Sequence, residues 1–364
     1  MPEKLKNLFF TDAFVQQLAD AIQADYPVFD RDRFLVRVQN DAWAGLELKQ
    51  RMNHITLALG ETLPKEYAQA LGILRTVGPR FSGFDTTVFP DFVATYGLDD
   101  LERSMEALAF FTTLCSSEYG VRPFIAREPE RAMAYLLAWA DDENEHVRRL
   151  ASEGCRPRVP WGMVLQGFRQ DPRPILPILE TLKDDPSKYV RTSVANNLND
   201  ISKDHPDVVL EVCERWYGHN HERDAIVKRA CRGLLRQGNR RAMRLFGFGE
   251  PTDIDVVDLT MDTKALDIGD ELRYEFDLDV RTQGPAKVRL ELAVDYARAR
   301  GKRSRKVFQV REATYEPGRH TLSRKLSFVD QSTRRHVPGE HRLAVIVNGV
   351  EKASATVELR SRAP

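Results

Sequence analysis

The residues best suited to chemistry cluster in one stretch, DDENEHVRRLASEGCRPRVPW (141–161). Val147, Leu150 and Ala151 recur at helical spacing, which predicts a helix with one buried stripe. Glu153 continues this face one turn later, so a carboxylate lies at the edge of an apolar stripe. An acid held in this way is a candidate for a functional site rather than for a solvated surface charge alone.

The turn after this helix adds cations and an aromatic ring. We expect the helix to begin at the acidic pair 141–142, which suits the positive end of its dipole. It should end before RPRVPW, because a residue that precedes proline is pushed out of the α region. Arg156, Arg158 and Trp161 are therefore held on a short, restrained connection beside Glu153. This combination is more typical of a site than of a structural joint.

A second carboxylate, Glu118, lies in CSSEYGVRP (115–123), an interruption between two predicted helices. Each candidate also has an ordinary structural interpretation. Glu118 could be a cap or a surface charge, and Glu153 could pair with Arg149 at i+4 in solvent. Trp161 alone is most simply explained by core packing. The residues by themselves leave these alternatives open.

Other catalytic classes lack their motifs. The four cysteines have no metal-binding spacing, and no HExxH follows from His146. Phosphate-binding glycine loops and nucleophile elbows are also absent from the sequence. We therefore expect carboxylate chemistry with no cofactor and no metal.

The composition sets the wider limits. A chain of 364 residues is long enough for two domains, and its formal net charge of zero does not by itself indicate nucleic acid. The N-terminus MPEKLKNLFF lacks the apolar region of a signal peptide, and no run approaches a membrane span. We expect a cytoplasmic protein without a membrane partner, and a monomer.

A helical repeat is expected to position the candidate residues. Residues 1–248 alternate helical patterns with short turns, and EHVRRLAS, KYVRTSVAN and AIVKRACRG align on an apolar-basic pair. These pairs begin at Val147, Val190 and Val227, at intervals of 43 and 37 residues. That is the spacing of HEAT-type repeats, which stack into a solenoid with a concave binding surface.

The pattern changes period after residue 248. Residues 273–280, 287–294 and 342–347 alternate as strands do, and Asn348-Gly349 is a strong hairpin signal. Roughly seven short strands in residues 249–364 fit an immunoglobulin-like sandwich, here without cysteines. The predicted fold is mainly α, with a HEAT-like α-α superhelical solenoid (1–248) followed by this all-β domain (249–364).

Basic residues gather in three places. RARGKRSRK (298–306) holds six cations in nine positions and no acid, and Arg334-Arg335 lies in a second connection. A solvated turn is the ordinary interpretation, but such a run without an anionic partner favours phosphate contact. In the helical domain, further cations could form a basic surface on one side of the solenoid. The candidates for DNA binding are Arg149, Arg156, Arg158, Lys188, Arg191, Arg300, Lys302, Arg303, Arg305, Arg334 and Arg335.

Three stretches carry a family resemblance: SSEYGVRPF (116–124), ENEHVRRLASEGCRPRVPWG (143–162) and DPSKYVRTSVANNLNDISKDHPDVV (185–209). With the appended β domain, essentially the whole chain resembles the HEAT-like alkylpurine DNA glycosylases, the AlkC/AlkD group, and more closely the AlkC branch. The resemblance implies excision of cationic alkylated bases, such as 3-methyladenine or 3-methylcytosine, from double-stranded DNA.

The same resemblance assigns roles to the candidate residues. It implies that Glu118 and Glu153 stabilise an oxocarbenium-like sugar and position water, while Trp161 lies against the lesion. Arg149, Arg156 and Arg158 would hold phosphates. Asp200 would face the same groove, although it could instead cap a following turn.

The resemblance also implies that the base stays largely stacked rather than being flipped. This sequence departs from the AlkD branch, which uses an aspartate flanked by two tryptophans, whereas Trp161 here accompanies two glutamates. Two alternatives remain at this stage: a non-catalytic HEAT scaffold that binds DNA or protein, and a family member that binds DNA but has lost its activity.

Overall fold

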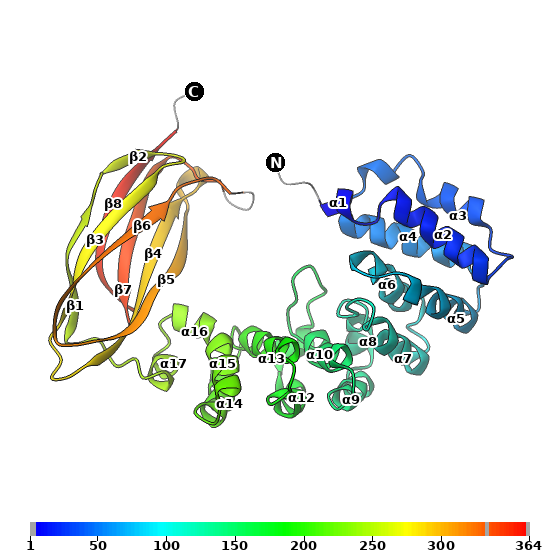
Figure 1. The fold of residues 1–364 in the computed structure, drawn as a ribbon, viewed down its shortest axis with the longest axis horizontal. Helices are drawn as coiled ribbons and strands as arrows, with labels where there is room; N and C mark the ends of the chain where they lie inside the picture. The colour runs from blue at the N-terminus through cyan, green and yellow to red at the C-terminus, as the bar shows by residue number, and fades with distance from the viewer. Residues whose placement is uncertain (1–4, 332–334, 362–364) are drawn as a thin grey trace. The chain divides into compact units, whose positions relative to one another are not determined.

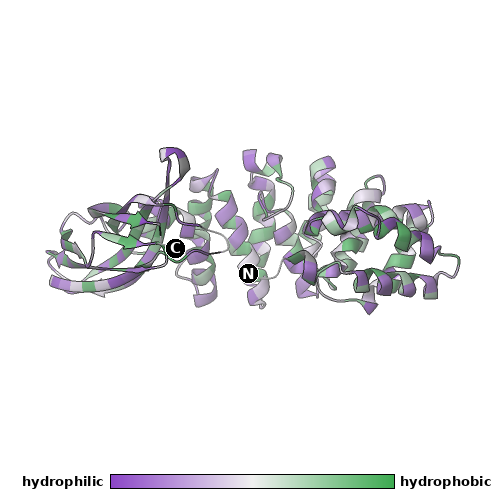
Figure 2. Ribbon diagram, turned by 90° about the horizontal axis from the view of Figure 1, so that it is seen from above, coloured by the Kyte–Doolittle hydropathy of each residue, from purple (hydrophilic) through white to green (hydrophobic). Residues whose placement is uncertain are grey.

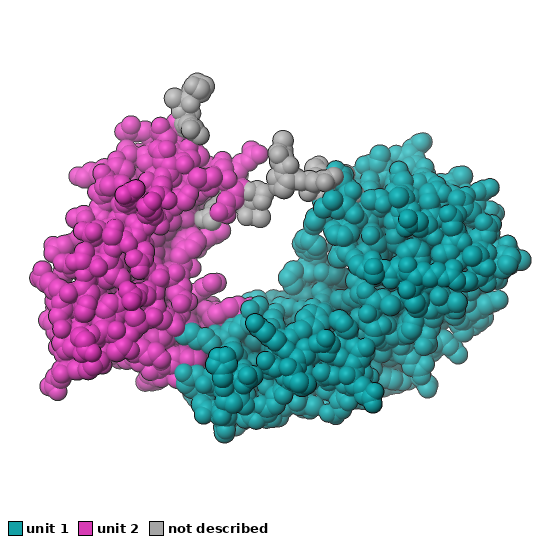
Figure 3. Space-filling model, in the orientation of Figure 1, with its two compact units in different colours: residues 1–230 teal, residues 231–364 magenta. Residues whose placement is uncertain are grey.

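The computed structural model describes residues 5–331 and 335–361. It divides the chain into two compact units, Met1–Ala230 and Cys231–Pro364, drawn in teal and magenta in Figure 3. Each unit is considered by itself below. No helix within the described ranges combines the length and the apolar character needed to cross a membrane.

The first unit consists of helices joined by short turns (Figure 1). In chain order the α-helices are α1 (Leu5–Leu8), α2 (Asp12–Asp25), α3 (Arg31–Val38), α4 (Leu48–Thr62), α5 (Tyr67–Val77), α6 (Val88–Tyr96), α7 (Leu101–Phe111), α8 (Arg122–Arg127), α9 (Pro129–Trp139), α10 (Glu145–Gly154), α11 (Gln166–Gln170), α12 (Leu176–Leu182), α13 (Lys188–Ile201), α14 (Pro206–Trp216) and α15 (His221–Ala230). The 3-10 turns are η1 (Trp43–Gly45), η2 (Gly78–Arg80), η3 (Phe84–Thr87) and η4 (Arg173–Ile175).

Helix α10 begins later than predicted. The acidic pair 141–142 was expected to start it, but the N-cap is Asn144, whose side chain accepts a hydrogen bond from the His146 N–H. Asp142 instead accepts from the Asn144 N–H at 2.8 Å, which turns the chain before the helix. The predicted stripe is confirmed, since Val147, the two residues at 150–151 and Glu153 are all buried. Figure 2 shows the resulting alternation of hydrophobic and hydrophilic residues along the helices.

The apolar-basic pair of the predicted repeat has a structural meaning. Helix α10 packs on α13, and α13 packs on α15. Arg148 in α10 donates to the carbonyl oxygens six and five residues before it, at 3.0 and 2.8 Å. Arg191 in α13 makes the same two bonds at the same offsets, at 2.6 and 2.9 Å. In both helices the basic residue therefore fixes the turn that leads into its own helix.

The second unit holds two sheets and two short helices. The strands are β1 (Ile254–Met261), β2 (Ala265–Asp267), β3 (Glu271–Val280), β4 (Ala286–Ala297), β5 (Arg303–Tyr315), β6 (Gly318–Ser327), β7 (Gly339–Val347) and β8 (Val350–Arg360). They form a three-stranded sheet, β1-β3-β6, and a five-stranded sheet, β2-β8-β7-β4-β5. All pairings are antiparallel except the parallel pair β2-β8. Alternate residues of these strands, such as Leu272, Tyr274 and Phe276 of β3, fill a shared core.

Helices α16 (Arg232–Arg236) and α17 (Arg240–Leu245) belong to this second unit. They meet the predicted hairpin at two glycines with positive φ, Gly238 and Gly349. A Cβ atom on Gly238 would lie 2.7 Å from the carbonyl oxygen of Gly349, so neither backbone leaves room for a side chain. The predicted boundary at 248/249 thus marks the change from helix to strand and not the division between compact units.

Candidate carboxylate site

Arg149 joins the two predicted carboxylates, which are 35 positions apart in the sequence. Its Nη1 lies 2.7 Å from Glu118 Oε2, and its Nη2 lies 3.4 Å from Glu153 Oε1. Ser116 completes this corner, because its hydroxyl accepts from Arg149 at 2.6 Å and donates to Glu118 at 3.0 Å. The i+4 pair between Arg149 and Glu153 exists, but it is buried rather than solvated, with the Glu153 side chain only 6% exposed.

The same pattern continues from Glu153 to helix α13. Arg156 contacts Glu153 Oε1 and also donates from Nε to Asp200 Oδ2 at 2.8 Å. Lys203 lies 2.7 Å from the other oxygen of Asp200. The second oxygen of Glu153 accepts from the Ser193 hydroxyl at 2.6 Å. We call the alternating series the ion-pair chain; its members are Glu118, Arg149, Glu153, Arg156, Asp200 and Lys203.

The charges of this chain support one another. Burial opposes the charged form of Arg149, but Glu153 and Glu118 outweigh it, and the pKa of Arg149 is raised. Burial likewise opposes the charge on Arg156, while Glu153 and Asp200 raise its pKa. Three acids thus alternate with three cations. This arrangement fixes the carboxylates of Glu153 on α10, Asp200 on α13 and Glu118 in the turn before α8.

Two aromatic side chains of the first unit, Trp161 and Tyr189, are exposed. Trp161 is 60% exposed, which differs from the core packing that a lone tryptophan would suggest. Tyr189, at the start of α13, is 44% exposed, and the Arg149 guanidinium lies 5.2 Å from its ring centre. The sequence interpretation did not identify Tyr189 or Ser193. Tyr189 therefore places an accessible aromatic ring beside Arg149 and the carboxylates that it binds.

Asp200 was predicted to face the same groove, with a helix cap as the alternative. The structure places it inside α13, buried and bound to Arg156 and Lys203. It is therefore not a cap, and it is brought together with Glu153 through Arg156.

The arginines predicted to hold phosphates have partners within the protein. Arg149 and Arg156 belong to the ion-pair chain, and Arg158 forms a two-fold ion pair with Asp204, one contact of which is 2.8 Å. Arg191 clamps the turn before α13, as described above. Their phosphate contacts remain predictions. These arginines are engaged with groups of the protein itself and do not form the open basic surface that was expected.

Lys188 is exposed at the start of α13. It lines a groove of about 380 Å³ with residues of α13 and α15, which include Arg191, Thr192, His221 and Arg229. Among the cations of the first unit that were predicted to bind DNA, Lys188 is the most open to a ligand.

The basic segment of the second unit is less isolated than predicted. Residues 298–302 connect β4 to β5 through η5 (Ala299–Gly301), where Arg300 is exposed with φ +63°. Lys302 is also exposed. However, Arg303 lies 2.7 Å from Glu340, and Arg305 lies 2.9 Å from Glu351. The run itself contains no acid, but β7 and β8 supply acidic partners for these two arginines within the protein.

The second basic connection can be assessed only in part. Arg335 is exposed, whereas Arg334 lies outside the described residues. The proposed DNA contact of this pair stays a prediction.

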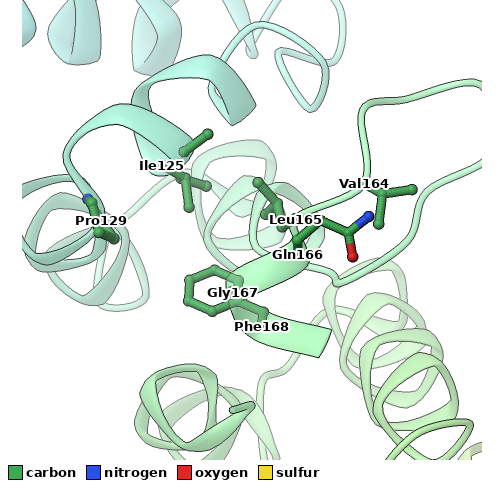
Figure 4. Close-up of a pocket in the computed structure, with 8 residues that line it drawn as sticks. Ile125, Pro129, Val164, Leu165, Gln166, Gly167 and Phe168 are labelled. Carbon is green, nitrogen blue, oxygen red and sulfur yellow. The ribbon is translucent and has the colours of Figure 1, made fainter. Parts of the chain in front are cut away.

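A separate apolar cavity lies at residues 164–168, which follow Trp161 in the chain. It measures about 270 Å³ and is lined by Ile125, Ala126 and Pro129 on one side and by residues 164–168 on the other (Figure 4). Glu118, Glu153 and Asp200 do not line it. Within the described ranges, no group of three or more His, Cys, Asp or Glu side chains is arranged to hold a metal ion.

Comparisons with known proteins point in one direction. A family model described as DNA alkylation repair enzyme matches residues 109–234, and one described as the C-terminal Ig-like domain of YhaZ matches residues 255–361. The uncharacterized protein YhaZ of Bacillus subtilis is 45% identical over 351 residues, covering 96% of this chain and 98% of the relative. The structure is also similar to Pseudomonas fluorescens alkylpurine DNA glycosylase AlkC bound to DNA containing an abasic site analog. That match has a TM-score of 0.93 at 38% identity, covering 98% of this chain and 100% of the other.

Proposed function

This chain belongs to the AlkC branch of the DNA alkylation repair family, and from that premise we propose that it is a DNA glycosylase. Its substrates would be cationic N-alkylated bases, such as 3-methyladenine and 3-methylcytosine, in double-stranded DNA. The observation that carries the proposal is the meeting of Glu118 and Glu153 on Arg149, beside the exposed ring of Tyr189.

The chemistry suits two fixed carboxylates. When the N-glycosidic bond breaks, its electron pair leaves with the base, which becomes neutral, and positive charge develops on the sugar. Preorganised carboxylates stabilise that oxocarbenium-like charge, and one of them can orient a water and accept its proton as the new C–O bond forms. Because alkylation already makes the base a good leaving group, no strong general acid is required.

In this proposal the arginines of the ion-pair chain serve as positioning groups. Arg149 and Arg156 hold Glu118, Glu153 and Asp200 in fixed orientations, so little reorganisation is needed during the reaction. The exposed face of Trp161 would lie against the lesion, where an aromatic ring attracts a cation. A base that stays stacked while the sugar is attacked is consistent with carboxylates that lie outside the cavity of Figure 4.

DNA would be held by the surface cations. We propose that the helices of the first unit form a HEAT-like solenoid whose concave face carries Lys188 and the neighbouring groove. Arg300, Lys302 and Arg335 of the second unit would contact phosphates elsewhere on the duplex. These contacts would position the protein without reading sequence.

The decisive experiment measures base release from DNAs that each carry one methylated base. We expect free 3-methyladenine or 3-methylcytosine and an abasic site in the product strand. Duplex binding without release from any of these DNAs would favour a family member that has lost activity. Binding that does not weaken as salt is raised would instead favour a scaffold for protein partners.

A further inference from the structure

The loop from Cys155 to Leu165 is held through its backbone carbonyls. Arg122 at the start of α8 is fully buried and donates to the carbonyl oxygens of Gly154 at 3.0 Å, Pro157 at 3.4 Å and Met163 at 2.5 Å. Burial lowers the pKa of Arg122 to about 10, so its guanidinium is still charged at neutral pH. One buried cation thus fixes both arms of a loop whose two prolines donate no hydrogen bonds.

Two other side chains hold the tip of this loop. The Tyr119 hydroxyl donates to the Pro160 carbonyl at 3.1 Å, and the Lys49 ammonium donates to the Trp161 carbonyl at 2.7 Å. Lys49 also lies 5.5 Å from the centre of the Tyr119 ring. Burial, reinforced by the charge of Glu118, raises the pKa of Tyr119 to about 12, so its hydroxyl remains a donor. Lys49 comes from α4, 112 positions away in the chain, so this contact is truly tertiary.

Trp161 itself adopts a demanding backbone conformation. Its φ is +63°, in the left-handed region that bulky residues rarely enter without support from their surroundings. The next residue, Gly162, has no room for a Cβ atom, which would lie 2.2 Å from a methyl carbon of Val159. The chain therefore turns sharply at Trp161 and leaves its ring exposed. Tyr119 bonds the Pro160 carbonyl, which precedes the Trp161 nitrogen, and Lys49 bonds the Trp161 carbonyl, which follows its Cα. The backbone is therefore held on both sides of the Trp161 Cα.

We propose that Lys49 and Tyr119 are positioning residues, which hold Trp161 in a fixed conformation at the tip of the loop. Tyr119 follows Glu118 directly in the chain, and its hydroxyl bonds the residue before Trp161. This bond therefore connects the backbone next to Trp161 to the residue that follows Glu118. The functional part of this inference rests on the proposed glycosylase activity, but the structural part does not.

The test uses Lys49→Met and Tyr119→Phe in the full chain, singly and combined. Matched controls are Lys65→Met, which removes another lysine bond to a carbonyl (Gly60, 3.0 Å), and Tyr67→Phe, which removes another tyrosine bond (Ser104, 2.8 Å). The fluorescence contribution of Trp161 is obtained for each protein by subtracting the fluorescence of the same protein carrying Trp161→Phe. The proposal predicts more rapid local motion of this ring in the Lys49 and Tyr119 variants and no change in the controls.

Excision by the double variant should be about ten- to a hundredfold slower in single turnover, as expected for a displaced group. In the Trp161→Phe background the same changes should have no further effect. If Lys49 instead contacts a phosphate, Lys49→Met would lower the salt slope of DNA binding by about one. It would also slow excision by the same factor in the parent protein and in the Trp161→Phe background. Either result overturns the proposal. Unchanged Trp161 fluorescence in both variants would overturn it as well.

This design separates two kinds of failure. If the parent protein releases no base from any methylated DNA, the proposed function fails, while the fluorescence comparison still decides whether Lys49 and Tyr119 hold the ring.

Discussion

Each unit of the molecule contains a buried network of arginines and acids, and the two networks differ in access. In the second unit, Arg289 bonds Glu291 at 2.5 Å and also contacts Glu312. Glu291 is fully buried, and burial raises its pKa despite Arg289. In the first unit, the ion-pair chain ends at the partly exposed Glu118 and is bordered by exposed Tyr189.

The contrast shows that ion pairs alone do not mark a site. Both networks place carboxylates in an environment of low polarity, where a charge is costly unless it is paired. The ion-pair chain has a partly exposed acid at one end and the exposed ring of Tyr189 beside Arg149, whereas Glu291 of the second network is fully buried. We therefore propose chemistry for the first network and a structural role for the second.

The strongest test of this contrast replaces one buried glutamate in each network. Glu153→Gln keeps the shape of the side chain but removes its charge, so we expect excision to fall about 10²–10³-fold. Glu291→Gln is the matched change in the second unit and should leave the excision rate per folded molecule unchanged. Single-turnover base release measures both. Parent-like activity of Glu153→Gln would refute our catalytic assignment.

Removing the central arginines tests how each network is supported. Arg156→Met leaves Glu153 with Arg149 and Asp200 with Lys203, whereas Arg289→Met removes a bonded partner from both Glu291 and Glu312. Loss of one partner from a buried pair costs about 3–5 kcal/mol, and we expect Arg289→Met to lie nearer the upper value.

Unfolding of the two units in urea can be followed by two different signals. All four tryptophans lie in the first unit, so their fluorescence reports its unfolding, while circular dichroism reports both units. A shift of the tryptophan transition by Arg289→Met alone would show that the two networks are not independent.

The basic segment of the second unit allows a finer comparison. Arg300 is exposed, whereas Arg303 has Glu340 as a competing partner. We expect Arg300→Ala to weaken duplex binding severalfold and to lower the salt slope by about one, and Arg303→Ala to have a smaller effect. Titrations at several salt concentrations measure this. Equal slopes for the parent and both variants would remove this segment from the interface.

The smallest expected effect concerns the acid dependence of the first unit. Hydrogen bonds from Arg158 lower the pKa of Asp204 in the folded protein. The pair therefore contributes stability above the unfolded pKa of Asp204, and this contribution is lost as pH falls through the lower, folded value. Because both side chains are partly exposed, we expect about 1 kcal/mol.

Asp204→Asn should accordingly flatten the decline in Tm between pH 5 and 3, followed by tryptophan fluorescence. A variant whose Tm declines as steeply as that of the parent would show that this pair does not contribute to acid stability.

The fold was largely accessible from the sequence because its signals are local. Helical and alternating periods predicted the two classes of element, and the buried stripe of α10 follows directly from its spacing. The start of α10 was misjudged because Asp142 bonds the Asn144 N–H and turns the chain, a choice that acidic composition does not reveal.

The site was less accessible because its contacts cross between helices that are far apart in the sequence. The roles of Glu118 and Glu153 came from the family resemblance, while the pairing of Arg156 with Asp200 spans 44 positions. An arginine whose acid lies on a distant helix resembles a phosphate ligand when only the sequence is read. Ser193 did leave a signal: it stands 43 residues after Leu150, at the stripe position where α10 has an apolar residue.

The contact between Gly238 and Gly349 has a consequence for how such chains recombine. Because the turn before α17 fits against the β7–β8 hairpin without space for a side chain, residues 231–364 form the portable module, although the strands begin only at Ile254. A graft or deletion that cuts the chain at 249 would separate α16 and α17 from the hairpin against which they pack. Chimeras within the family should therefore be joined near residue 230, so that the transplanted part keeps this contact.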